Sequence, residues 1–108
     1  MRKLLITCAA FAALSGLAMA DTTWSGPLLD AHCANRHADE ACYAKRSTTK
    51  FVLDDNGTRY RLDNMTNLNV SSAMQARKRS ERSVPAIAIL TGHMRNSGKI
   101  DAHIIAVQ

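Results

Sequence analysis

The chain has 108 residues, with 14 lysines and arginines against 9 acids, which gives a formal net charge of +5 at neutral pH. This length supports one small domain with a modest hydrophobic core. Only two tyrosines, two phenylalanines and one tryptophan are present. So few aromatic side chains form a thin stacking platform for bases, which makes nucleic acid a poor candidate partner.

The first twenty residues have the pattern of a secretory signal peptide. Arg2 and Lys3 supply a positive start, residues 4–17 form an apolar stretch too short to span a bilayer, and an A-M-A triplet at 18–20 suits signal peptidase. We expect cleavage after residue 20 and export to the periplasm or the outside, with no stable membrane anchor. Residues 21–108 would then form a single domain whose charge of +3 permits an anionic partner without requiring one.

A β-hairpin is predicted over residues 51–62. The Asn-Gly pair at 56–57 is a strong signal for a two-residue type I′ turn, because both central residues of that turn need positive φ. The turn places Asp54 opposite Arg59 on one face and apolar residues opposite each other on the other face. Since a one-residue slip would break both matches, the pattern and the turn agree on the register.

A second hairpin is predicted at the C-terminal end. Residues 84–94 and 99–108 flank a polar segment at 95–98. If those four residues are the loop, Ile89 faces Ile104. Both faces of these strands carry apolar residues, which is typical of a closed or curled sheet.

The remaining segments complete a mainly β domain. Residues 22–30 form the first strand, bent at its Gly-Pro pair, and a short helix is expected from Ser71 or Ser72 to about Arg82. Another short helix is expected within residues 38–46. Five strands, with hairpins at strands 2–3 and 4–5, predict a small OB-fold-like barrel with one or two short helices. A small β-sandwich is the alternative.

The segments also resemble a known group of proteins. The chain matches the opening W-x-G-x-L-x-D-x-x-C at five positions: Trp24, Gly26, Leu28, Asp30 and Cys33. Together with the closing strands "IAILTGHM" and "GKIDAHIIAVQ", this is similar to small exported bacterial domains of uncharacterised function and to periplasmic bacterial OB-fold proteins. The resemblance implies the fold, the location and a stress-related binding role, and it supplies no catalytic residues. The chain departs from the pattern in a basic insertion at 65–83.

Two cysteines, Cys33 and Cys42, remain after the predicted cleavage. Cysteines in a small exported domain pair by default, so we expect a disulfide. A disulfide needs the two Cα atoms within about 7 Å, which a continuous helix between them does not allow. We therefore expect a loop from Cys33 to about His37, with helix only after it.

The same segment allows a metal-binding alternative. Zinc or copper can be held by imidazoles and thiolates, and this segment offers two of each: His32, Cys33, His37 and Cys42. The spacing is unlike that of structural zinc sites, and an oxidising compartment removes the thiolates. A catalytic cysteine is disfavoured, since a disulfide consumes the nucleophile. No hydrolase, nucleotide-binding or metalloprotease motif is present, so we predict a protein that is not an enzyme and needs no cofactor.

The insertion carries a run of positive charge, "RKRSER". One interpretation is a solvated helix end. The other is an anion-binding patch shared with basic residues of the first hairpin. That predicted patch consists of Arg59, Arg61, Arg77, Lys78, Arg79 and Arg82, with Lys50 and Tyr60 nearby. The sequence thus predicts an exported, non-enzymatic binding or envelope-stress module whose ligand is an acidic glycan or another anion, with periplasmic metal binding as the alternative.

Overall fold

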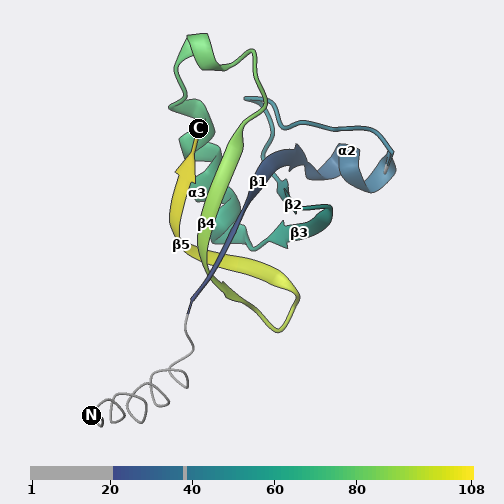
Figure 1. Cartoon of the computed structure of the whole chain (residues 1–108), viewed down its shortest axis with the longest axis vertical. Coiled ribbons are helices and arrows are strands. Elements are labelled where there is room, and N and C mark those ends of the chain that lie inside the picture. Colours follow the sequence, from purple (N-terminus) through teal and green to yellow (C-terminus); the bar gives the residue numbers. More distant parts are fainter. Residues whose placement is uncertain (1–20, 38) are drawn as a thin grey trace, which may run out of the picture.

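The computed structural model describes residues 21–37 and 39–108, and the predicted signal peptide lies outside this part of the chain. Five strands form a closed barrel in the order β1-β2-β3-β5-β4 (Figure 1). The strands are β1 (Thr22–Asp30), β2 (Phe51–Asp55), β3 (Thr58–Leu62), β4 (Ile87–Met94) and β5 (Lys99–Val107); the helices are α2 (Ala31–Arg36), α3 (Asn64–Gln75) and the 3-10 turn η1 (Arg79–Glu81). The predicted OB-fold-like barrel is confirmed, and the sandwich alternative is excluded.

Strand β1 closes the barrel because it pairs with two neighbours. Its residues 22–27 pair with β4 and its residues 28–30 pair with β2. The change of partner occurs at the predicted bend. There Gly26 has a φ of +156°, and a Cβ on this residue would overlap the backbone carbonyl oxygen of Asp54. Glycine therefore lets β1 pass against the backbone of β2 where any side chain would be excluded.

The first hairpin has the predicted register. Asp54 pairs with Arg59, and the two turn residues, Asn56 and Gly57, both have positive φ. The local signal of the Asn-Gly pair was thus sufficient to place the four residue pairs from 52–61 to 55–58.

The predicted register of the second hairpin is wrong. Ile89 pairs with Ala106, and Ile104 pairs with Thr91. The loop between the last paired residues is one residue longer than assumed, and a bulge between Thr91 and Gly92 shifts the pairing again. A bulge of this kind adds one unpaired residue to a strand. No turn motif in the sequence indicates its position.

Helix α3 differs from the predicted helix in both of its ends. It begins directly after Asp63, whose carboxylate accepts a hydrogen bond from the Thr66 amide, and it ends at Gln75, so a helix from Ser71 or Ser72 to Arg82 is wrong. The face of α3 that meets the barrel mixes polar and apolar side chains, which hides the helical period in the sequence. These buried residues are Thr66, Asn67, Val70 and Met74.

The two buried polar residues of α3 bind backbone groups of the strands. The Asn67 amide accepts a hydrogen bond from the Phe51 amide at 2.8 Å and donates one to the Leu62 carbonyl at 3.2 Å. The Thr66 hydroxyl accepts from the Ala102 amide at 3.0 Å. Buried backbone groups need such partners. Helix α3 therefore covers one end of the barrel and also supplies hydrogen-bond partners for backbone groups of the strands.

The core lies inside the barrel and under α3. Its buried hydrophobic residues are Trp24, Leu28, Phe51, Leu53, Leu62, Val70, Met74, Ala86, Ala88, Leu90, Ile100 and Ala102. They come from all five strands and from α3, with Ala86 just before β4, so no single hairpin has a core of its own. None of the helices in the described ranges is long and apolar enough to cross a bilayer.

The short helix near the disulfide is also displaced from its prediction. Helix α2 follows β1 directly, contains Cys33 and ends at Arg36, whereas no helix is found in the described residues of 38–46. The expectation of a loop from Cys33 to His37 with helix after it is therefore wrong. The Asp30 carboxylate starts α2 by accepting a hydrogen bond from the Cys33 amide at 3.1 Å, and it also accepts one from the Thr48 hydroxyl at 2.9 Å.

The two helix-capping aspartates make the fold sensitive to acid. Partial burial raises the pKa of Asp30 and of Asp63, but hydrogen bonds to their carboxylates outweigh this effect, so both pKa values lie below their ordinary value. For Asp63 the Arg95 guanidinium at 3.3 Å lowers the pKa further. A lowered folded-state pKa contributes stability that is complete above the unfolded pKa of about 3.9 and is lost as pH falls through the folded value.

We therefore expect urea midpoints to fall as pH decreases from about 5 to 2. Asp30→Asn with Asp63→Asn should lower stability at pH 7 but flatten this dependence, because asparagine still caps a helix and does not titrate. Equal losses between pH 5 and pH 2 in the native chain and the double variant would contradict the assignment.

Candidate functional site

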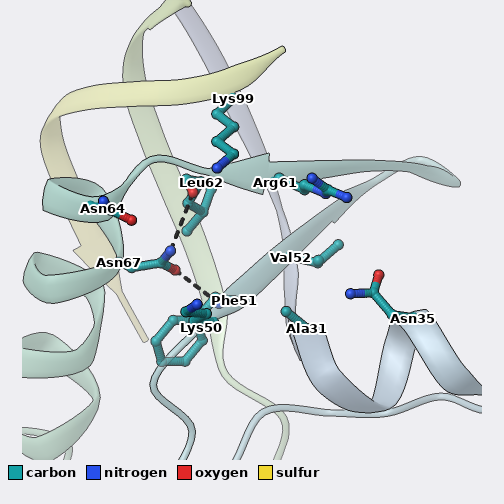
Figure 2. A pocket seen from close by; sticks show the side chains of 10 residues that line it. All are labelled: Ala31, Asn35, Lys50, Phe51, Val52, Arg61, Leu62, Asn64, Asn67 and Lys99. Atoms are coloured by element: carbon teal, nitrogen blue, oxygen red, sulfur yellow. Dashed lines mark hydrogen bonds between the residues drawn. The ribbon is translucent and has the colours of Figure 1, made fainter. Parts of the chain in front are cut away.

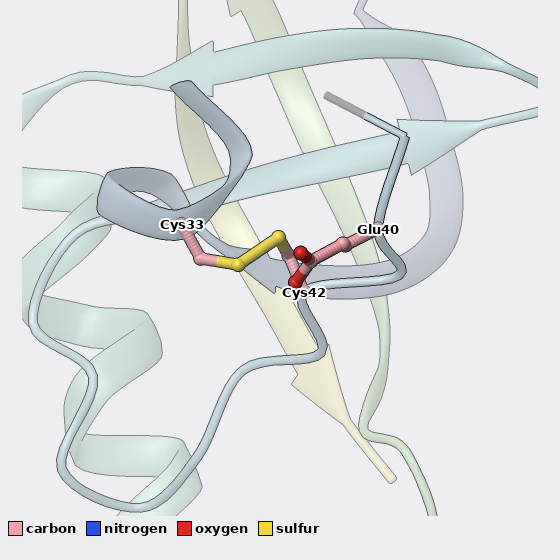
Figure 3. Close-up of side chains that lie close together, drawn as sticks. All are labelled: Cys33, Glu40 and Cys42. Atoms are coloured by element: carbon pink, nitrogen blue, oxygen red, sulfur yellow. A yellow bond between two sulfur atoms is a disulfide. The ribbon is translucent and has the colours of Figure 1, made fainter. Parts of the chain in front are cut away.

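The cysteine segment contains the predicted disulfide. Cys33 on α2 is bonded to Cys42 in the following loop, with a Cα–Cα distance of 5.6 Å (Figure 3). Cys42 has a φ of +54°, so the loop turns back sharply toward α2. The disulfide therefore fixes a six-residue helix that is too short to be stable by itself.

The metal-binding alternative finds little support in this geometry. Ligand atoms of the two cysteines and Glu40 lie within 4.8 Å of one another, but both sulfurs belong to the disulfide and offer no thiolate (Figure 3). The imidazole of His37 pairs with Glu40 at 3.6 Å, and that of His32 lies 3.3 Å from the Arg36 guanidinium. In the described part of the chain, neither imidazole joins the cysteines in a group of metal ligands.

Arg77 is a structural residue, which corrects its place in the predicted anion-binding patch. Only 7% of Arg77 is exposed. Its guanidinium donates hydrogen bonds to the carbonyls of Glu81 at 2.6 Å and Val84 at 3.2 Å. It therefore folds the connection between α3 and β4 and is not available to a ligand.

The other five residues of the predicted patch are divided between two ends of α3. Lys78, Arg79 and Arg82 lie in and around η1, beyond the C-terminal end of the helix, whereas Arg59 and Arg61 belong to β3, next to its N-terminal end (Figure 1). A helix of 12 residues is about 18 Å long at 1.5 Å per residue. The five residues thus lie in two groups, separated by about the length of α3.

A basic cleft lies instead where β2, β3, β5 and the two helices meet. Its cations are Lys50, Arg61 and Lys99, which come from three different segments and border one hollow of about 220 Å³ (Figure 2). Arg61 and Lys99 are direct partners in the parallel pairing of β3 with β5. Two like charges at paired positions of a sheet are unfavourable, so this arrangement opposes stability unless an anion neutralises it.

Polar amides and apolar residues form the rest of the basic cleft. Asn35 reaches it from α2, and Asn64 and Asn67 reach it from α3 (Figure 2). The side chain of Asn67 already bonds to the Phe51 amide and the Leu62 carbonyl. Neither Asn35 nor Asn64 has a side-chain hydrogen bond within the described chain. None of the ten described lining residues is acidic.

The cations of the basic cleft are not neutralised by carboxylates of the described chain. Arg95 pairs with Asp63 at 3.3 Å and with Asp101 at 3.5 Å, and His103 pairs with Asp21 at 3.1 Å. The three cleft cations, like the other lysines and arginines of residues 21–37 and 39–108 apart from Arg95, have no carboxylate partner. The cleft therefore has a local excess of positive charge that the fold itself does not balance.

Sequence reasoning found part of this site. It named Arg61 as a site residue and Lys50 as its neighbour, because the first hairpin places them close together. It missed Lys99, because this residue reaches Arg61 only through the parallel pairing of β3 with β5 across more than 30 residues of chain. Nothing in the local sequence around Lys99 signals that pairing.

No protein family, curated protein or solved structure was found to match this chain. The resemblance to small exported domains therefore stays a prediction, and the basic cleft is interpreted from its own geometry.

Proposed function

We propose that this protein is an exported, non-enzymatic module that binds an anionic ligand in the basic cleft. The observation that carries the proposal is the group of three cations, Lys50, Arg61 and Lys99, around one hollow with no acidic residue in its described lining. Anions are held most strongly by such charge-assisted hydrogen bonds, and the planar guanidinium of Arg61 suits a carboxylate, phosphate or sulfate in particular.

The composition of the cleft favours binding over chemistry. Its described lining contains no cysteine, serine, histidine or carboxylate that would act as a nucleophile or as a general acid or base at neutral pH. The amides of Asn35 and Asn64 add neutral donors that can orient a ligand. This combination supports recognition of an anionic group without its transformation.

Export is proposed from two independent features. The first is the signal pattern of residues 1–20, and the second is the disulfide, which is typical of oxidising compartments. In that location an acidic glycan or another anion of the cell envelope is the fitting ligand, and a role in envelope stress agrees with such binding. Nucleic acid is a poorer fit, because no aromatic ring other than that of the buried Phe51 lines the cleft in the described structure.

The proposal predicts that charge removal at the basic cleft weakens anion binding. Heparin is a suitable probe, since it carries both sulfates and carboxylates. The triple variant Lys50→Ala, Arg61→Ala, Lys99→Ala should bind at least tenfold more weakly than the native chain at low salt. Its plot of log affinity against log salt should be shallower, because fewer counterions are exchanged on binding.

A control triple variant, Arg46→Ala, Lys78→Ala, Arg79→Ala, removes the same charge from exposed positions outside the cleft. It should retain most of the affinity, and circular dichroism should show both variants folded. Equal losses in the two variants would show that only net charge matters. A larger loss in the control would place binding at the insertion, as the sequence first suggested. Either result would overturn the proposed site.

A further inference from the structure

A second hollow adjoins the basic cleft on the side of α3. It has a volume of about 240 Å³ and shares Lys50, Asn64 and Asn67 with the basic cleft. Thr49 and Leu68 complete its lining, and most of the lining surface is apolar. We call this hollow the Leu68 hollow. Since three residues line both spaces, a single ligand can occupy the two at once.

Leu68 gives the Leu68 hollow its apolar character. It is a helical leucine with 63% of its surface exposed, although the opposite face of α3 is buried in the barrel. A single exposed leucine needs no explanation by itself. Here, however, it lies beside a concentration of positive charge, and the Lys50 side chain, with an apolar stem and a charged head, lines both hollows.

We propose that the ligand is an amphiphilic anion. Its charged group lies among Lys50, Arg61 and Lys99, and its alkyl or aromatic part lies in the Leu68 hollow. This inference rests on the proposed function, and it adds the chemical class of the ligand. A purely polar anion would leave Leu68 exposed, whereas an apolar substituent would cover it and gain about 25 cal/mol for each Å² removed from water.

Met65 distinguishes a site for a small ligand from a face that docks on a membrane. It lies three residues before Leu68 and has nearly the same exposure, 62%. Yet it lines a different hollow, which shares Asn64 and Lys99 with the basic cleft but is more polar than the Leu68 hollow and contains Asp63 and Arg95. A flat anionic bilayer resting on α3 would contact both residues. A small amphiphile in the concave site contacts Leu68 and not Met65.

Calorimetric titration with inorganic phosphate and with octyl phosphate, kept below its micelle concentration, tests the inference. We expect octyl phosphate to bind at least tenfold more tightly than inorganic phosphate. A tenfold gain corresponds to about 1.4 kcal/mol, which the burial of about two methylene groups provides. Leu68→Ser should remove most of this gain and leave the affinity for inorganic phosphate unchanged.

Met65→Ser is the matched control, and it should leave both affinities unchanged. The inference is overturned if octyl phosphate binds no more tightly than inorganic phosphate. It is also overturned if Met65→Ser and Leu68→Ser weaken octyl phosphate equally and both reduce binding to phosphatidylglycerol vesicles, which would indicate a membrane face. If the Lys50→Ala, Arg61→Ala, Lys99→Ala variant still binds inorganic phosphate as the native chain does, the proposed function itself fails, and this inference with it.

Discussion

Replacing Gly26 with alanine is expected to destabilise the fold by roughly 3–5 kcal/mol, a large part of the 5–15 kcal/mol typical of a protein's total stability. Two effects combine at this position. The added Cβ would overlap the Asp54 carbonyl oxygen, and the φ of +156° is one that residues with a side chain rarely adopt. The obstacle is backbone, so no side-chain rotation relieves it. Strands β1 and β2 would have to separate where β1 changes partner and the barrel closes.

Gly57→Ala provides the control for Gly26→Ala. Gly57 also has a positive φ, +92°, but no atom lies within 4 Å of the position its Cβ would take. Gly57→Ala should therefore lose only the stability that a positive φ costs a residue with a side chain, roughly 1–2 kcal/mol. Urea unfolding followed by tryptophan fluorescence measures both variants, because Trp24 lies in the core. Equal losses of stability in the two variants would mean that the close approach of β1 and β2 contributes nothing.

The parts of the fold that sequence predicted correctly depend on neighbouring residues. The type I′ turn at Asn56 and Gly57 requires positive φ at two adjacent positions, so the dipeptide alone fixes the hairpin and its register. The first strand ends where an aspartate can cap a helix, and its bounds were predicted correctly. The closed barrel followed from apolar residues on both faces of the C-terminal strands.

The parts that were predicted wrongly depend on distant partners. Helix α3 buries Thr66 and Asn67 because their side chains bind backbone groups of β2, β3 and β5. In the sequence, two polar residues give no indication that they are buried. The helix was therefore predicted to begin at Ser71 or Ser72, whereas it begins at Asn64. Similarly, the bulge between Thr91 and Gly92 has no local signature, so the second register was missed.

The basic cleft shows the same division between local and distant signals. Arg61 belongs to a hairpin whose register was predicted correctly, and it lines the basic cleft. Arg77 and Arg61 were assigned to one surface because charge was counted without knowing that α3 separates them and that Arg77 points into its own loop. Positive charge in a sequence thus identifies candidates, whereas the pairing of strands decides which of them meet.

The disulfide was predicted from compartment and composition, and its removal should have a large effect. Cys33 and Cys42 are separated by nine positions, so the chain-entropy relation gives a contribution of about 2.5–3 kcal/mol. For a domain of this size that corresponds to a fall in Tm of roughly 10–20 °C. We expect this fall in the native chain treated with a phosphine reductant and in the variant Cys33→Ser, Cys42→Ser.

The loss should extend from stability to binding, because the disulfide fixes the helix that forms one wall of the basic cleft. Helix α2 has six residues and carries Ala31 and Asn35, both of which line the cleft. Without the bond to Cys42, α2 would be held by the Asp30 cap, by its contact with Thr48 and by the hydrogen bond from the Ala31 amide to the Lys50 carbonyl. Binding of inorganic phosphate should then weaken several-fold, even at temperatures where the barrel stays folded. The serine variant serves as the control, since reductant should not change it further. Unchanged Tm and unchanged phosphate affinity after complete reduction, verified by thiol titration, would show that α2 is held without the crosslink.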